Sequence, residues 1–231
     1  MRYPVGKTVV IALGGSIMYP DAIDTSFLRE FKRFILSFTP KGWRFVLVAG
    51  GGHAARVYQE AASKLTMLTD NDKDWLGIHA TRTNAHLIRT IFRDVANPVV
   101  ADARYKIKKL TYPVTTAGGW HPGWSTDYVA LATAYDLRIP EVIVAGKPAY
   151  VYDKDPHKFK NAKPIPQCTW KEYRMLIPKK WEPGFHSPVD PIAAKLGATT
   201  GTNAIIINGK DLKNLRALLL GKEFKGTIIS G

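Results

Sequence analysis

One unit recurs along this chain and limits the folds open to it: a short apolar run that ends in glycines. Four such runs occur at Thr8–Leu13, Arg44–Ala49, Tyr112–Thr116 and Glu141–Ala145. Glycines follow them at Gly14, Gly50, Gly118 and Gly146. Because helical patterns separate these runs, we expect parallel strands with crossover helices. The sequence therefore predicts an α/β fold whose mainly parallel sheet is covered by helices on both faces.

The segment Ala117–Asp127 combines three glycines with a helix start at Ser125-Thr126-Asp127. Glycine has no Cβ, so a ligand can approach the backbone closely. The first N–H groups of a helix and its partial positive charge suit a phosphate. An ordinary capped loop accounts for this segment equally well when it is taken alone. None of the glycine turns matches the P-loop or the dinucleotide-binding fingerprint.

A second turn, Gly50–Gly52, leads into a helix predicted over His53–Leu65. Arg56 lies near the start of this helix, where its guanidinium could reach an anion held by the glycines. The alternative is a solvent-facing arginine. We favour the anion contact, because three consecutive glycines weaken a strand end unless the backbone must pass close to something.

The 33 Lys and Arg residues give the 231-residue chain a net charge of +14. These side chains are spread along the sequence, without a zinc-finger spacing or an Arg/Gly-rich tail, so nucleic-acid binding is not the expected main role. A surface that attracts small phosphorylated substrates accounts for the charge. The single Cys168 fits a reducing compartment, and no segment approaches membrane-spanning length. We expect a cytoplasmic protein without a membrane partner.

Apolar periodicity and turn residues predict the elements of the intervening segments. Helices are predicted near Phe27–Phe38 and at Trp75–Val95, Tyr128–Leu137, Thr169–Leu176, Val189–Leu196 and Asp211–Leu220. Further strands are predicted at Pro98–Val100, Tyr150–Tyr152, Ala204–Asn208 and Thr227–Ser230. Thr66–Asp74 and Asp153–Pro166 are expected to be loops.

Taken together, the motifs resemble the amino acid kinase superfamily, and within it the archaeal-type uridylate (UMP) kinases and similar bacterial chains. The matching segments fall in order over nearly the whole chain: Leu13–Ser16, Gly50–Arg56, Asp74–Ile78, Thr81–Ala85, Gly118–Asp127, Val151–Pro156, Val189–Lys195 and Gly226–Ile228. The resemblance implies one three-layer αβα sandwich over residues 1–231. About residues 1–125 would form the UMP-binding half, and about 126–231 the ATP-binding half.

The resemblance also implies an enzyme of pyrimidine nucleotide synthesis that transfers the γ-phosphoryl group of ATP to UMP, giving UDP and ADP. Mg²⁺ would accompany ATP, no metal site built from the protein's own side chains is expected, and the assembly would be a homo-oligomer, a hexamer in similar proteins. The implied ATP-binding residues are Gly15, Ser16, Gly52, Arg56, Gly146, Lys147, Tyr152 and Asp155. The implied UMP-binding residues are Gly51, Asp74, Trp120, His121, Pro122, Gly123, Trp124, Ser125 and Thr126.

Three residues are expected to be catalytic: Lys147, Arg56 and Asp127. Many superfamily members carry a lysine where this chain has Ala12, so Lys147 is the candidate that would supply the missing cation. The segment Lys147–Tyr150 also lacks the aspartate and glycine usual in the family. Two alternative functions stay open: a related kinase for another small acid or phosphate, such as isopentenyl phosphate, and a nucleotide- or anion-binding relative with little kinase turnover.

Overall fold

The computed structural model describes residues 1–156, 158–179 and 187–231. Its large sheet has the strand order β3-β2-β1-β4-β8-β9-β7 over these residues. The strands of this sheet are β1 (Thr8–Leu13), β2 (Arg44–Ala49), β3 (Val114–Ala117), β4 (Glu141–Gly146), β7 (Gln167–Thr169), β8 (Asn203–Asn208) and β9 (Thr227–Ser230). Neighbouring strands run parallel, except that β9 is antiparallel to β8. The predicted mainly parallel sheet is confirmed.

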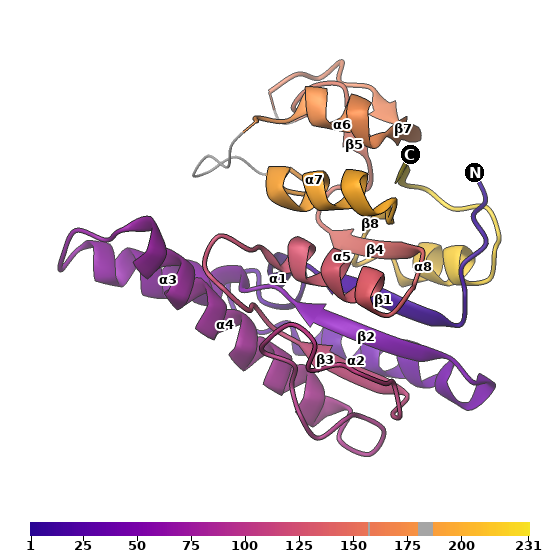
Figure 1. The fold of residues 1–231 in the computed structure, drawn as a ribbon, viewed down its shortest axis with the longest axis horizontal. Coiled ribbons are helices and arrows are strands. Elements are labelled where there is room, and N and C mark those ends of the chain that lie inside the picture. The colour runs from indigo at the N-terminus through magenta and orange to yellow at the C-terminus, as the bar shows by residue number, and fades with distance from the viewer. Residues whose placement is uncertain (157, 180–186) are drawn as a thin grey trace.

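Helices cover both faces of this sheet (Figure 1). They are α1 (Gly15–Met18), α2 (Thr25–Leu36), α3 (Gly52–Ser63), α4 (Asp70–Ile91), α5 (Thr126–Asp136), α6 (Trp170–Leu176), α7 (Pro191–Thr200) and α8 (Leu212–Leu219), with a 3₁₀ turn at Thr39–Lys41. Alternate strand residues face opposite sides. Val9 and Ile11 pack with α2, α8 and the end of α4, whereas Val10 and Ala12 pack with α5, α6 and α7. The structure is therefore the expected αβα sandwich.

The strand order places β1 between β2 and β4, although β4 follows three connections later in the chain. The next strand in the chain, β2, lies on one side of β1, and the later strand β4 lies on the other side. In open α/β sheets a crevice opens beyond the carboxyl ends of the strands at such a point. The glycine turns after β1, β2 and β4 all lie at this edge.

Helices α3 and α4 form an arm that extends away from the sheet (Figure 1). The loop Thr66–Asp74 was predicted here, and that prediction is wrong for its second half, because α4 begins at Asp70. Thr69 caps the helix in a reciprocal box with Asp72, whose carboxylate accepts from the Thr69 N–H. This box stabilises the first turn although the sequence there is polar.

Two other predictions about elements need correction. Pro98–Val100 is not a strand; the Asn97 side chain accepts a hydrogen bond from the Val99 N–H, which favours a turn, and Pro98 has no N–H to donate. The segment Asp153–Pro166 is not all loop, because Pro164–Ile165 forms β6, which pairs with β5 (Val151–Tyr152) in a separate sheet. Helix α4 also ends at Ile91, before the predicted Val95. In the described part of the chain, no helix is both long and apolar enough to cross a membrane.

Candidate active site

The glycine turns after β1 and β2 touch through their backbones. The Gly50 N–H donates to the Leu13 carbonyl at 2.9 Å, and the Gly14 N–H donates to the Ala145 carbonyl of β4 at 3.0 Å. A Cβ added to Gly15 would lie 2.0 Å from the Gly52 nitrogen, which is far inside van der Waals contact. These strand ends therefore present a surface of backbone rather than side chains, as a closely approaching phosphate requires.

Helix α4 holds the glycine turn after β2 in place through hydrogen bonds. The buried Asn84 amide donates to the Gly50 carbonyl at 2.8 Å and to the Gly51 carbonyl at 3.0 Å. Buried carbonyl groups need such partners, because leaving them unpaired is costly. Asn84 thus fixes the turn from which α3 starts.

The same helix holds the loop that follows β3. Thr81 accepts a hydrogen bond from the Gly119 N–H at 2.6 Å, and Arg82 donates to the Gly119 carbonyl at 3.0 Å. The Asp74 carboxylate accepts from the Gly123 N–H at 2.6 Å. Helix α4 therefore contacts the loop at both ends and sets its path across the carboxyl edge of the sheet.

A cavity of about 220 Å³ lies between this loop, α3 and α4. It is lined by Gly51, Gly52, Ala55, Gln59, Lys73, Asp74, Gly77, Ile78, Thr81, Gly119, His121, Trp124, Ser125 and Thr126. Six of the nine residues expected to bind UMP are on this wall. The Gly123 N–H donates to the wall residue Asp74, and the Pro122 carbonyl lies 2.7 Å from Nδ1 of the neighbouring His121, from which it can accept a hydrogen bond. Trp120 is buried behind the wall, and its carbonyl accepts a hydrogen bond from Arg82.

The start of α5 forms the end of this cavity. Ser125 caps the helix, since its hydroxyl oxygen accepts from the Tyr128 N–H at 3.1 Å. The same hydroxyl donates a short hydrogen bond to Asp190, which in turn caps α7 by accepting from the Ile192 N–H at 2.8 Å. The hydrogen bond between Ser125 and Asp190 therefore connects the N-termini of α5 and α7.

Asp127 follows in the first turn of α5. Burial, together with repulsion from the nearby Asp190 carboxylate, raises the pKa of its carboxyl to about 8. A carboxyl with such a pKa is mainly protonated at neutral pH. Perturbed carboxyls of this kind gather at functional sites, which supports the inclusion of Asp127.

Among the residues predicted for ATP, Gly52 lines this cavity, and the others lie outside it. Gly146 ends β4, and its carbonyl accepts from the Gly209 N–H at 2.8 Å. Lys147 is exposed just beyond it, and its carbonyl accepts from the Asn208 side chain. Tyr152 lies in β5 with its ring 6.3 Å from that of Tyr150.

The other predicted ATP residues fall at three places. Gly15 and Ser16 are in α1, next to Gly52, and Asp155 is in the loop after β5, where its carbonyl accepts from Phe159. The Arg56 guanidinium donates to the Pro20 carbonyl at 3.3 Å and lines an open groove of about 490 Å³ beside the cavity. Arg56 therefore lies between the β1 turn and this groove, and it is not one of the residues that line the smaller cavity.

Several residues of the site were absent from the predicted set. Gln59 and Lys73 line both the cavity and the open groove, and the Gln59 amide donates to the Lys73 carbonyl at 2.8 Å. Asn84 and Asp190 hold the glycine turn and Ser125. The signal for Asn84 was its polar side chain in the buried stripe of a helix, whereas Gln59 carried no signal in the sequence.

The chain is similar in sequence and in structure to several known proteins. Residues 7–208 match the model of the amino acid kinase family. The chain is 34% identical to the uridylate kinase of Thermococcus sibiricus, over 96% of this chain and 98% of that protein. It is 30% identical to the uridylate kinase of Hyperthermus butylicus over the same shares of each chain. The crystal structure of uridylate kinase from Archaeoglobus fulgidus superposes with a TM-score of 0.82 at 27% identity and covers all of both chains.

Proposed function

The chain belongs to the amino acid kinase family, and from that premise we propose that it is a uridylate kinase. It transfers the γ-phosphoryl group of ATP to UMP, giving UDP and ADP, in pyrimidine nucleotide synthesis. The uridylate kinases of Thermococcus sibiricus and Hyperthermus butylicus support this proposal, because each is matched over nearly its whole length.

The observation that carries the proposal is the cavity between Gly51, Asp74 and Thr126. It places a carboxylate, a glycine turn and a helix N-terminus around one small space. A nucleoside monophosphate needs these three groups: the phosphate faces the turn and the helix start, and the ribose hydroxyls donate to Asp74. The loop residues His121 and Trp124 complete the wall on the side of the base.

Phosphoryl transfer requires positioning and charge stabilisation more than covalent chemistry from the protein. In this proposal the ATP phosphates lie over the turns of Gly15, Ser16 and Gly52, and UMP approaches from the adjoining cavity. Backbone N–H groups at these turns, together with Arg56 and Lys147, stabilise the negative charge that develops on the transferred group. Tyr152, Asp155 and Gly146 are proposed to hold the rest of ATP. Asp127 is proposed to act beside them, at the start of α5.

Mg²⁺ enters with ATP as the complex that serves as substrate, and it screens the charge of the phosphates. No group of three His, Cys, Asp or Glu side chains that could hold a metal ion is found among the described residues. Magnesium bound mainly by nucleotide phosphates and water needs no such group.

A coupled assay of ADP release tests the proposal. Purified protein with ATP and Mg²⁺ is given UMP, CMP or isopentenyl phosphate, and UMP should be turned over fastest. Faster turnover of CMP or of isopentenyl phosphate would contradict the assignment. UMP binding without UDP formation would favour a binding relative over a kinase.

The remaining expectations are also part of the proposal: a cytoplasmic homo-oligomer, a hexamer, with UMP held by about residues 1–125 and ATP by about 126–231. The arm of α3 and α4 supports an oligomer, because it carries Leu65 and Met67 with 87% and 95% of their surfaces exposed. Large exposed apolar side chains that lie together often mark contacts between proteins. Sedimentation velocity would measure the number of subunits.

A further inference from the structure

Two residues share an unusual backbone conformation on one face of the protein. Over the described residues, Tyr105 and Arg138 are the non-glycine residues with positive φ, at 64° and 56°. A side chain with a Cβ adopts this left-handed conformation only where the surrounding structure holds it, and such positions are frequent at functional sites. Both side chains are exposed, with 64% of the Tyr105 surface accessible.

An ion pair joins the two segments that carry these residues. Arg104 donates to both carboxylate oxygens of Asp136, at 2.9 Å and 2.8 Å. The Arg104 guanidinium also lies 4.8 Å from the centre of the Tyr105 ring. Bidentate pairs of this kind fix both partners in orientation. The pair therefore ties the connector before β3 to the end of α5 and presents the ring of Tyr105 outward.

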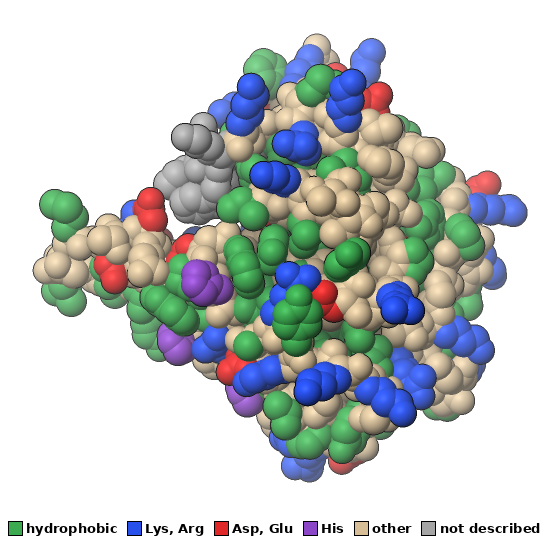
Figure 2. Space-filling view, viewed as in Figure 1, with side chains coloured by type: hydrophobic (Ala, Val, Ile, Leu, Met, Phe, Trp, Pro, Cys, Tyr) green, Lys and Arg blue, Asp and Glu red, His purple; other side chains and the backbone are tan. Residues whose placement is uncertain are grey.

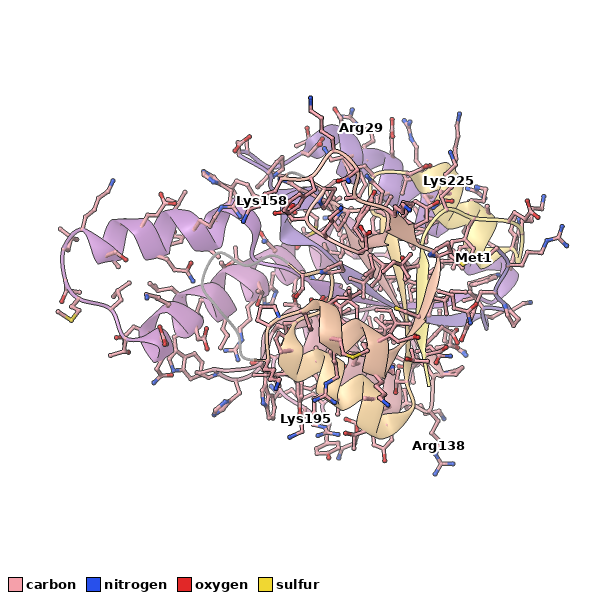
Figure 3. All side chains as sticks on the ribbon, turned by 90° about the horizontal axis from the view of Figure 1, so that it is seen from above. Met1, Arg29, Arg138, Lys158, Lys195 and Lys225 are labelled. Carbon is pink, nitrogen blue, oxygen red and sulfur yellow. The ribbon has the colours of Figure 1, made fainter. Side chains whose placement is uncertain are left out.

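The two segments joined by this ion pair are rich in positive charge. Residues 102–109 and 135–138 contain five Lys or Arg and two Asp. The two aspartates pair with Arg104 and Lys106, which leaves Lys108, Lys109 and Arg138 without an ion pair within the described ranges. Figure 2 shows Lys and Arg side chains spread over the face of the molecule that it views, and Figure 3 shows Arg138 pointing away from the body.

We propose that this basic tyrosine face, defined by Tyr105, Lys108, Lys109, Tyr135 and Arg138, binds single-stranded nucleic acid. Tyr135 is also exposed, so the face offers a second aromatic ring. Bases of a single strand stack on exposed aromatic rings, while lysine and arginine neutralise the phosphates between them. A duplex keeps its bases paired and stacked, so it cannot use the rings in this way.

The basic tyrosine face is separate from the proposed kinase site. Ser125 and Thr126 at the start of α5 line the cavity, whereas Asp136 and Arg138 lie at the end of this 11-residue helix. A helix of this length spans roughly 16 Å. Nucleic-acid binding and UMP turnover should therefore respond to different substitutions.

Fluorescence anisotropy of a labelled oligouridylate of about ten nucleotides, a length within reach of one such site, tests the proposal. The double variant Lys108→Glu/Lys109→Glu should weaken binding at least about tenfold near 0.1 M salt and flatten the salt dependence. Arg29→Glu/Lys225→Glu is the matched control, since it makes the same charge change on the opposite side of the molecule (Figure 3). It should weaken binding by less than about twofold, because its charges lie away from the strand.

The variant Tyr105→Asn removes the ring but keeps a residue that tolerates the left-handed backbone. It should weaken binding about five- to tenfold without changing the salt dependence, since stacking releases no counterions. Equal losses from both charge variants, tight binding of a duplex or of heparin, or unchanged binding by Tyr105→Asn would each overturn the proposal. UMP turnover of all variants should stay at the wild-type rate, which shows that they are folded.

Discussion

Arg56 lines the open groove and Asp74 lines the cavity, so the two residues are expected to affect different kinetic constants. Arg56→Ala should lower kcat about tenfold or more, because a charge-assisted hydrogen bond to phosphate is worth about 1.5–3 kcal/mol. Asp74→Asn keeps an oxygen for the Gly123 N–H but loses a charged acceptor for ribose, so KM for UMP should rise about tenfold. Steady-state kinetics with both substrates varied separates these effects, with Tyr58→Phe, an exposed residue on the helix of Arg56, as control. Equal small effects from both variants would contradict the assignment.

Lys147 is the cation expected to compensate for Ala12. It directly follows Gly146 at the end of β4, and Pro148 restricts its backbone to an extended conformation. Lys147→Ala should reduce kcat about 10²-fold, as expected for the loss of one donor to the transition state. Lys171→Ala, an exposed lysine on α6, is the control. A kcat for Lys147→Ala within about twofold of wild type would mean that Lys147 is an ordinary surface lysine without a catalytic role.

Asp127 should make stability depend on pH. Its pKa rises from 3.8 to about 8 on folding, so the folded state binds this proton more tightly than the unfolded state. The contribution of Asp127 to stability is therefore greatest below pH 4 and is lost as the pH rises toward 8. The Asn side chain of Asp127→Asn stays neutral at every pH. The free energy of unfolding of this variant, relative to that of wild type, should therefore increase by at least about 1 kcal/mol from pH 4 to pH 8. Urea denaturation of both proteins across this range measures the difference, and a constant difference would contradict the pKa shift.

Among the elements, α4 does the most to shape the site, because Asn84, Thr81 and Asp74 each bind a different backbone segment. Asn84→Ala would leave the buried Gly50 carbonyl without its donor, at a cost of about 1–3 kcal/mol. The variant should also lose UMP turnover, since the glycine turn is released. Thr83→Ala is a matched control, because its exposed hydroxyl bonds only to its own helix at His79. Thermal unfolding and turnover of the two variants test this difference.

The helices and strands also differ in how well the sequence predicts them. Strands that end in glycines, such as β1 and β2, were predicted because buried parallel strands are continuous apolar runs. The start of α4 was missed, because a capping box between Thr69 and Asp72 outweighs the polar character of its first turn. The strands β6 and β7 have two and three residues, too few for a period to appear.

For the site, the sequence could predict the residues that carry a local pattern, and not those that meet only in three dimensions. Gly51 lies in a glycine turn, and Ser125 and Thr126 lie at a helix start, whereas Asp74 was implied only by the family resemblance. Asp190 lies 65 residues after Ser125 in the chain, and only the packing of α7 against α5 brings their side chains together. No spacing in the sequence indicates such a contact.

At the scale of the whole molecule, UMP should stabilise the fold, since its cavity is enclosed by three separate elements, α3, α4 and the start of α5. A ligand that binds only the folded state at about 100 times its Kd adds about 2.7 kcal/mol. For a chain of this size each kcal/mol raises Tm by about 2–4 °C, so saturating UMP should raise Tm by about 5–10 °C. Uridine, which lacks the phosphate for the glycine turn, is the control and should raise Tm much less. Asp74→Asn should reduce the shift in Tm with UMP, because the ribose loses its charged acceptor. An equal shift with uridine and with UMP would mean that the Gly51 turn and the start of α5 do not hold the phosphate.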